Sequence, residues 1–223
     1  MRESTIQVAA EKPAALIETQ YFPPIVFFVL WAHFGKIILE QHENYQKRSF
    51  RNRCYITGAD GKFHLSIPLR KGKNVQQQIT DVVIAHDEPW PDKHWRAAQS
   101  AYGKAPFFRF YAEEVHYLFN DPGDNLFEFN LSIVKVLGKL IGLTGHIFLS
   151  SKYTPDPGPP VIDFRNKIGI GHGWQNYFKI GRYNQVFEDR LPFSENLSIL
   201  DLLFCTGPEA ISILRSSKLL ISY

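Results

Sequence analysis

The pattern of apolar residues predicts that the chain opens with a strand–turn–helix–strand unit. An apolar run at 14–18 is typical of a buried strand. The proline pair at 23–24 suits a turn and the first turn of a helix, so a helix is expected from there to about residue 34. Gly35 ends this helix, and a second strand follows at 36–39. Two strands joined through a helix indicate a βαβ unit.

The middle of the chain mixes strand and helix signals. Asp60-Gly61 lies between apolar runs, which predicts a hairpin with strands at 53–58 and 63–68. A loop is expected at Gly72-Lys73-Asn74. Spacing of apolar residues predicts further elements: a strand at Ile79–Ile84 and helices at Lys93–Gly103, from Pro106 through Tyr117, and at Asn125–Leu143.

The last third of the chain is predicted to be mostly helical. A strand at 146–149 precedes a Pro- and Ser-rich break at 150–159, which is either a linker or a surface loop. Two closing helices follow at 197–204 and 208–214, and Ser194 or Asn196 is expected to cap the first. We therefore expect an α/β fold with a mixed sheet, begun by the strand–turn–helix–strand unit, and a helical second half.

Composition narrows the class of protein. A length of 223 residues and a net charge of +3 suit one globular domain at 14–223, with 1–13 as a disordered tail, and give no general argument for nucleic acid. Only Cys54 and Cys205 are present, which favours a reducing cytoplasm over a disulfide scaffold. The apolar run at 25–39 is too short and too interrupted for a membrane span.

The segment 40–53 has the densest polar chemistry. It follows a predicted strand, and ligand groups gather where the strands of α/β proteins end. Glu40 and His42 are candidates for a base and its orienting partner. Arg48, Asn52 and Arg53 are candidates for holding an anionic group. The alternative is a solvated loop, where charge runs usually belong.

Two further pairs each have two interpretations. Gln20 and Tyr21 precede a predicted helix N-terminus, so they belong either to a phosphate cradle or to a stiff turn with Tyr21 in the core. Tyr183 and Gln185 lie two residues apart, so they either stack on and hydrogen-bond a sugar or base, or belong to an edge strand with one core aromatic.

His94 is the third histidine candidate besides His42 and His86. Its ordinary pKa near neutrality suits a general base or a hydrogen-bond anchor. The alternative is a histidine packed on a helix face beside Trp95. His86 and His94 have aspartates nearby, but their spacing matches no zinc motif, so neither a metal nor another cofactor is expected.

Four blocks of residues occur in order across 15–215. They are Gln20 to Pro24, His42 to Arg53, a third block that runs from Trp90 to Phe108, and a fourth formed by Tyr183 to Phe187 with Leu197 to Leu203. Together these blocks resemble the WbqC-like family of bacterial proteins.

The resemblance implies a role in surface polysaccharide assembly, O-antigen included. A reaction that fits is acyl or aminoacyl transfer to an amino sugar, and the alternative is a non-catalytic module that binds a nucleotide-sugar or a partner. The substrate is expected to be a nucleotide-linked sugar or another small anion, with an aminoacyl-tRNA as a possible donor; the sequence leaves the oligomeric state open. The expected catalytic residues are His94, His42 and Glu40, and the expected substrate-binding residues are Gln20, Tyr21, Gln46, Arg48, Asn52, Arg53, Tyr183 and Gln185.

Overall fold

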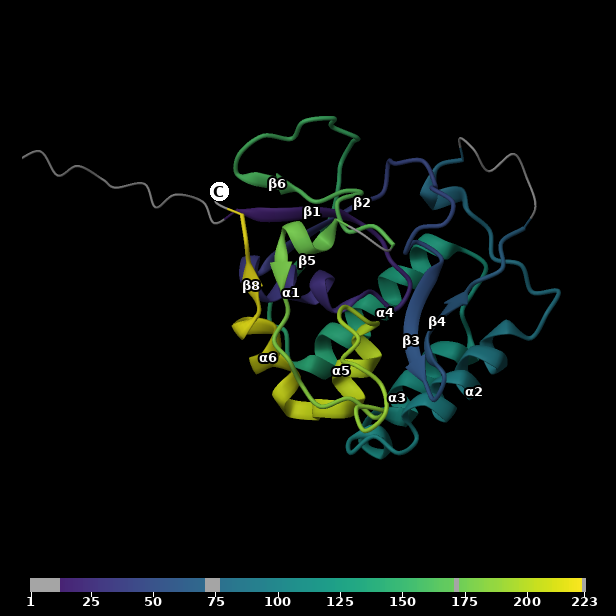
Figure 1. Ribbon diagram of the computed structural model, residues 1–223. Coiled ribbons are helices and arrows are strands. Elements are labelled where there is room, and N and C mark those ends of the chain that lie inside the picture. The colour runs from purple at the N-terminus through teal and green to yellow at the C-terminus, as the bar shows by residue number, and fades with distance from the viewer. Residues whose placement is uncertain (1–12, 71–76, 171–172, 222–223) are drawn as a thin grey trace, which may run out of the picture.

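The computed structural model describes residues 13–70, 77–170 and 173–221, and a four-stranded sheet organises them (Figure 1). Its strand order is β5-β2-β1-β6, and each neighbouring pair is parallel. The strands are β1 (Ala14–Glu18), β2 (Lys36–Glu40), β5 (His146–Leu149) and β6 (Val161–Asp163). Every residue of β1 is buried, as expected for an inner strand of a parallel sheet.

Helix α1 (Ile25–Phe34) connects β1 to β2, which confirms the predicted βαβ unit. Its sequence is apolar on nearly all sides, and a helix of that kind has to be covered on all sides. Figure 1 shows α1 on the same side of the sheet as α5 (Ile199–Thr206) and α6 (Ala210–Ser216). Gly35 ends α1 in the left-handed conformation at φ 68°, where a residue with a Cβ is strained.

The remaining elements complete an α/β fold with a helical second half, as predicted. Strands β3 (Arg53–Gly58) and β4 (Gly61–Ser66) form an antiparallel hairpin apart from the parallel sheet. The other elements are the helices α2 (Trp90–Tyr102), α3 (Phe108–Asn120) and α4 (Leu126–Ile141), the 3-10 turns η1 (Ile79–Asp81), η2 (Trp174–Asn176) and η3 (Gly207–Glu209), and the paired strands β7 (Phe178–Lys179) and β8 (Lys218–Leu219).

The strand predicted at Ile79–Ile84 is wrong. The segment starts with the 3-10 turn η1, and after it Val83 and Ile84 form only isolated bridges, to Asn125 and Leu69. Because this segment lies against the start of α4, Ile79, Val82 and Ile84 are buried without the ladder of a strand.

The predicted cap of the first closing helix is also wrong. Ser198 caps α5, since its Oγ accepts from the backbone N–H of Leu200 at 3.4 Å. Asn196 instead closes α1, because its Oδ1 accepts from the N–H of Val26 at 3.1 Å. The neighbouring Leu197 carbonyl accepts from the N–H of Ile25 at 3.0 Å. One short segment therefore closes the N-termini of two helices.

Some predictions fall wholly or partly on residues outside the described ranges. The loop at Gly72-Lys73-Asn74 does so, and so does the N-terminal tail apart from Pro13. Among the helices in the described part of the chain, none is both long and apolar enough to cross a bilayer.

Candidate functional site

The carboxyl edge of the parallel sheet gathers acids from three strands, and two of these acids are buried. Glu18 ends β1, Glu40 ends β2 and Asp163 ends β6. These ends meet because the strands run in parallel, and this is the edge where open α/β sheets bind ligands. Glu18 is 2% exposed and Glu40 is 0% exposed. Carboxyl groups buried so deeply need polar partners. Glu18 accepts from Gln20 Nε2 at 2.9 Å and from the backbone N–H of Asn166 at 2.9 Å, and two arginines bind the other acids at this edge.

Arg165 is the first of these arginines. It lies just beyond β6 and donates to Glu40 Oε2 at 2.8 Å and to Asp163 Oδ2 at 2.7 Å. These carboxylates raise the pKa of its guanidinium above the ordinary value, Asp163 contributing most. Its guanidinium also lies 4.6 Å from the centre of the Tyr153 ring, so Arg165 connects the acids to an aromatic wall.

Glu40 serves as an anchor rather than as a surface group. Its Oε1 accepts from the Ser150 hydroxyl at 2.6 Å and from the backbone N–H of His42 at 2.9 Å. Ser150 follows β5, so this carboxylate holds together the chain ends beyond two neighbouring strands. The predicted pairing of Glu40 with the His42 imidazole is not the bond observed, because the contact is to the backbone of His42.

Arg51 is the second arginine, and it is 1% exposed. Its Nε donates to Glu43 Oε1 at 2.7 Å, and its Nη2 donates to Glu43 Oε2. The same Nη2 donates to Asn166 Oδ1 at 3.0 Å. Asn166 in turn donates its backbone N–H to Glu18 Oε2 at 2.9 Å. This chain of bonds connects the loop after β2 to the ends of β1 and β6.

Glu43 is the acid of this group with a strongly shifted pKa. Burial raises its pKa to about 7, and the charges of Glu18 and Glu40 act in the same direction, whereas Arg51 opposes them. A carboxyl group that titrates near neutrality can both accept and return a proton at physiological pH. Glu43 is therefore a candidate for acid–base chemistry.

A cavity of about 500 Å³ opens onto this acid. We call it the sheet-edge cavity; its lining residues are His42, Glu43, Asn44, Tyr45, Gln46, Tyr153, Arg165 and Asn166. The His42 Nε2 donates to the Ser150 carbonyl oxygen at 3.1 Å, and Nδ1 takes no part in this bond. The wall thus combines an acid of shifted pKa, an imidazole, a guanidinium and two phenols.

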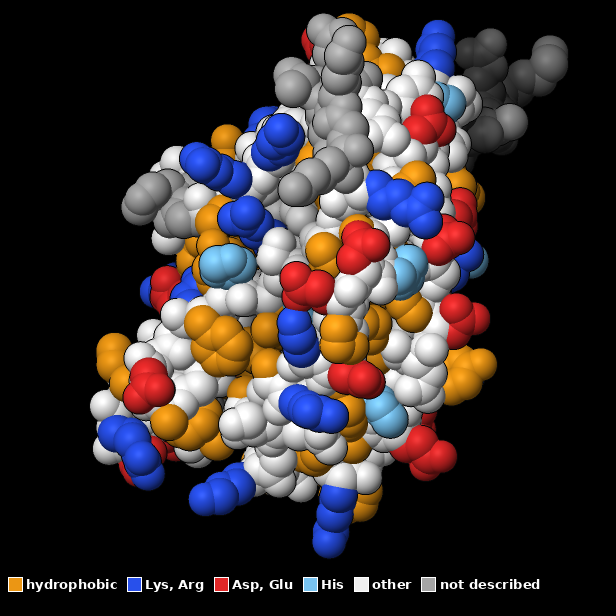
Figure 2. Space-filling view, turned by 90° about the vertical axis from the view of Figure 1, so that its right-hand side faces the viewer, with side chains coloured by type: hydrophobic (Ala, Val, Ile, Leu, Met, Phe, Trp, Pro, Cys, Tyr) orange, Lys and Arg blue, Asp and Glu red, His pale blue; other side chains and the backbone are white. Residues whose placement is uncertain are grey.

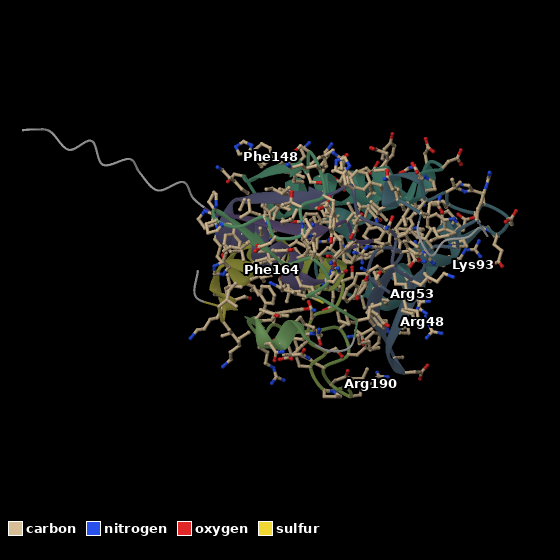
Figure 3. The ribbon with its side chains drawn as sticks, turned by 90° about the horizontal axis from the view of Figure 1, so that it is seen from above. Arg48, Arg53, Lys93, Phe148, Phe164 and Arg190 are labelled. Atoms are coloured by element: carbon tan, nitrogen blue, oxygen red, sulfur yellow. The ribbon has the colours of Figure 1, made fainter. Side chains whose placement is uncertain are left out.

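A second, basic cavity of about 250 Å³ adjoins the first, since Tyr45 lines both. Its other lining residues are Lys47, Arg48, Asn52, Arg53 and Leu69. The Tyr45 hydroxyl donates to Asn52 Oδ1 at 3.0 Å, so Asn52 helps to build the partition. Figure 3 shows the Arg48 and Arg53 side chains close together. Figure 2, which shows the right-hand side of the molecule in Figure 1, has Lys and Arg side chains gathered at its upper left.

The other residues predicted for the site do not line either of these two cavities; they are Gln20, Tyr21, His94, Tyr183 and Gln185. Gln20 and Tyr21 are 0% exposed. The backbone N–H groups at the start of α1 are also bonded within the protein, which agrees with the packed-turn interpretation rather than with a phosphate cradle. The Tyr21 hydroxyl and His94 Nδ1 lie 2.8 Å apart in an aromatic cluster with Trp90 and Phe129. Burial lowers the pKa of His94 to about 4.

Tyr183 and Gln185 belong to a buried network. The Tyr183 hydroxyl donates to Asp201 Oδ2 at 2.5 Å, and Gln185 Nε2 donates to the same oxygen at 2.8 Å. Asp201 is 0% exposed, and burial raises its pKa. Neither Tyr183 nor Gln185 lines the sheet-edge or the basic cavity.

Glu43, Arg165 and Asn166 line the sheet-edge cavity but were not among the site residues expected from the sequence. Glu43 lies within the segment 40–53 that was predicted as a site, but its pairing with Arg51 was not predicted. Arg165 and Asn166 follow a three-residue strand that gives almost no local signal. Only the pairing of β6 with β1 brings them to this edge.

Fold and site together define an α/β protein with a polar cavity at the carboxyl edge of a parallel sheet. The sequence profile of the WbqC-like protein family matches residues 19–159 and 161–213, so this chain belongs to the WbqC-like family. It is 25% identical over 237 residues to "Uncharacterized protein Rv1507c" of Mycobacterium tuberculosis, covering 92% of this chain and 98% of that relative. No solved structure matches the chain.

Proposed function

We propose that this protein is a transferase that adds an acyl or aminoacyl group to an amino sugar in surface polysaccharide assembly, O-antigen included. The observation that carries the proposal is Glu43, a buried carboxyl group with a pKa of about 7 on the wall of the sheet-edge cavity. The role in polysaccharide assembly comes from the family resemblance, and the chemistry comes from this side chain.

In the proposed reaction, the sugar amine attacks the carbonyl carbon of an activated donor. The new N–C bond forms as the bond from that carbon to the leaving group breaks, and the amine proton passes to the Glu43 carboxylate. Arg51 holds this carboxylate through two hydrogen bonds. Arg165 lies on the same wall, where its bonds to Glu40 and Asp163 hold the chain after β6 at the cavity.

Glu43 takes the role of base in place of His94. A base has to reach the proton that it removes, and His94 lies in an aromatic cluster apart from the sheet-edge cavity. With its pKa lowered to about 4, its imidazole is also a weak base. His42 lines the cavity and remains a second candidate for proton transfer.

A nucleotide-linked amino sugar fits the two adjoining cavities. Tyr45 and Tyr153 offer rings on which a sugar can pack. Arg48, Lys47 and Arg53 in the basic cavity offer charge to the phosphates of the same molecule. If an aminoacyl-tRNA is the donor, these cations also suit its backbone, and binding would then weaken steeply with added salt.

A second candidate is a non-catalytic module that binds a nucleotide-sugar. The observation in its favour is that His94, the base expected from the sequence, shares no cavity with Arg48. A module needs the cations and the phenols but not an acid–base group. The two candidate functions therefore differ in whether Glu43 is needed for turnover or only for folding.

The first test is a thermal-shift titration with nucleotide-linked amino sugars. A ligand that binds only the folded protein raises Tm. Arg48→Ala should reduce this shift, whereas Arg190→Ala, which also removes an exposed arginine but lies away from Arg48 (Figure 3), should preserve it. No shift with any nucleotide-linked amino sugar would count against both candidates.

Turnover then separates the two candidates. With a bound sugar and a panel of activated acyl donors, the rate in the transferase should rise with pH around 7 as Glu43 loses its proton. Glu43→Gln should abolish turnover, and His94→Gln should retain it. Binding without turnover in the unaltered protein would favour the module.

A further inference from the structure

A third cavity lies between the β3–β4 hairpin and the described parts of the chain at 169–170 and 174–196, and the proposed function makes no use of it. Its volume is about 660 Å³, the largest among the cavities described here. Figure 1 shows the hairpin beside the chain that leads into α5. We call it the hairpin cavity.

Aromatic rings line the hairpin cavity from both directions. Phe50 and Tyr55 come from the hairpin side, with ring centres 6.1 Å apart and planes at 80°. Trp174 and Phe193 come from the opposite segment. Rings of this kind offer flat surfaces on which a planar ligand ring can stack.

Two cations lie over these rings. The Lys62 Nζ is 4.9 Å from the centre of the Tyr55 ring, and the Arg182 guanidinium is 5.5 Å from the centre of the Phe193 ring. Within the described residues, neither cation forms a salt bridge, and Glu195 is the one acid of the lining. The cavity therefore has excess positive charge next to its stacking surfaces, which favours a ligand with both a flat ring and an anionic group.

Asn196 adds a directional hydrogen-bond donor. It is 3% exposed and lines the cavity. Its Oδ1 accepts from the N–H of Val26, and this bond fixes which end of the amide faces α1. In the described part of the chain, this is the one hydrogen bond of the Asn196 side chain, and it leaves Nδ2 available to a ligand. A buried amide oriented in this way can donate to an acceptor on a ligand ring.

We propose that the hairpin cavity binds a nucleotide. The base stacks on the aromatic walls, Asn196 Nδ2 donates to an acceptor on the base, and Lys62 and Arg182 bind the phosphates. This site is separate from the sheet-edge cavity, and the proposal holds whether or not the transferase reaction does.

The test uses Trp174 as a reporter. It is the one tryptophan that lines this cavity, so a base that stacks in the cavity should quench its fluorescence. The same ligand should cause no such quenching in Trp174→Phe. The four nucleoside diphosphates ADP, GDP, CDP and UDP are titrated, with the nucleosides and pyrophosphate as half-ligands. At least one diphosphate should quench, and both of its halves should bind more weakly.

Variants then locate the binding site. Lys62→Ala and Arg182→Ala should each weaken diphosphate binding by about tenfold or more, measured by calorimetry. Arg190→Ala is the matched control from the same segment and should leave the affinity unchanged. Both cations are exposed, so these variants should fold.

Two results would overturn the proposal. One is the absence of binding by all four diphosphates. The other is binding that survives Lys62→Ala and Arg182→Ala but is lost in Arg48→Ala, which would assign the nucleotide to the basic cavity. The second result would support the proposed function while removing this site, so the two proposals can fail separately.

Discussion

Glu43 and Asp201 are both buried acids whose pKa is raised by burial, but they lie in different surroundings. Glu43 bonds to Arg51 and lines a cavity. Asp201 is 0% exposed and accepts hydrogen bonds from Tyr183 and Gln185 in the core. A shifted pKa alone therefore does not mark a functional site, since structural networks produce it too. Access from a cavity distinguishes the two acids.

The largest expected effect comes from breaking the ion pair on the Glu43 side. Arg51→Leu removes the guanidinium and leaves Glu43, Asn166 and the sheet ends without their shared donor. Removing one partner of a buried pair costs about 4 kcal/mol of unfolding free energy. Urea denaturation followed by circular dichroism measures this loss. A change below 1 kcal/mol would mean that the network does not hold the sheet edge together.

The pH dependence of stability should separate Glu43 from His94 by sign. The folded-state pKa of His94, about 4, is below its ordinary 6.5, so the unfolded chain takes up a proton first and stability falls as pH drops from 6.5 to 4. The folded-state pKa of Glu43, about 7, is above its ordinary 4.5, so stability rises as pH drops from 7 to 4.5. Each effect is about 3 kcal/mol, and they largely offset each other.

Variants reveal the two opposing slopes. His94→Gln should gain stability as pH falls from 7 to 4.5, because only the Glu43 effect remains of the two. Glu43→Gln should lose stability over the same range. The measurement is the free energy of unfolding at several pH values, read as a slope so that a constant cost of either substitution cancels. Equal slopes in both variants would contradict the assignment.

A smaller effect is expected on the Asp201 side of the comparison. Asp201→Asn keeps the shape but replaces the carboxylate, whose Oδ2 accepts from both Tyr183 and Gln185, with a neutral amide. We expect a loss of about 2 kcal/mol in unfolding free energy. Nucleotide-sugar binding, followed by calorimetry, should not change. A loss of binding with an unchanged fold would place Asp201 in the site after all.

The smallest effect on stability, with a large effect on binding, is expected for Arg48→Ala. Arg48 is exposed, so its replacement by Ala should change the unfolding free energy by less than about 0.5 kcal/mol. Affinity for an anionic ligand should fall by about tenfold. Calorimetry checks the affinity, and chemical denaturation checks the stability.

Local signals were enough to predict several elements. The proline pair and Gly35 delimit α1, and Asp60-Gly61 marks the hairpin. Asn125 caps α4, as its Oδ1 accepts from the N–H of Glu128 at 3.1 Å. Such signals act over a few residues. The segment at 79–84 was predicted incorrectly because its apolar pattern resembles a strand, while contacts with α4 decide its conformation.

In the candidate site, too, local signals predicted the segment but not the long-range contacts of its residues. The segment 40–53 was marked by its polar residues alone, and it does line two cavities. The sequence did not show which acid of this segment has a shifted pKa, because burial and long-range neighbours set the pKa of Glu43. The roles expected for His94, Tyr183 and Gln185 depended on exposure, and the sequence does not report exposure.

By itself, then, the sequence determined the βαβ opening, the hairpin, the helices and the polar segment after β2, since periodicity, proline and glycine act locally. Tertiary structure alone decided which polar groups meet. Arg165 reaches Glu40 across 125 residues, and Arg51 reaches Asn166 across 115. These contacts exist because β6 pairs with β1, and strand order depends on the packing of the whole chain rather than on any local signal.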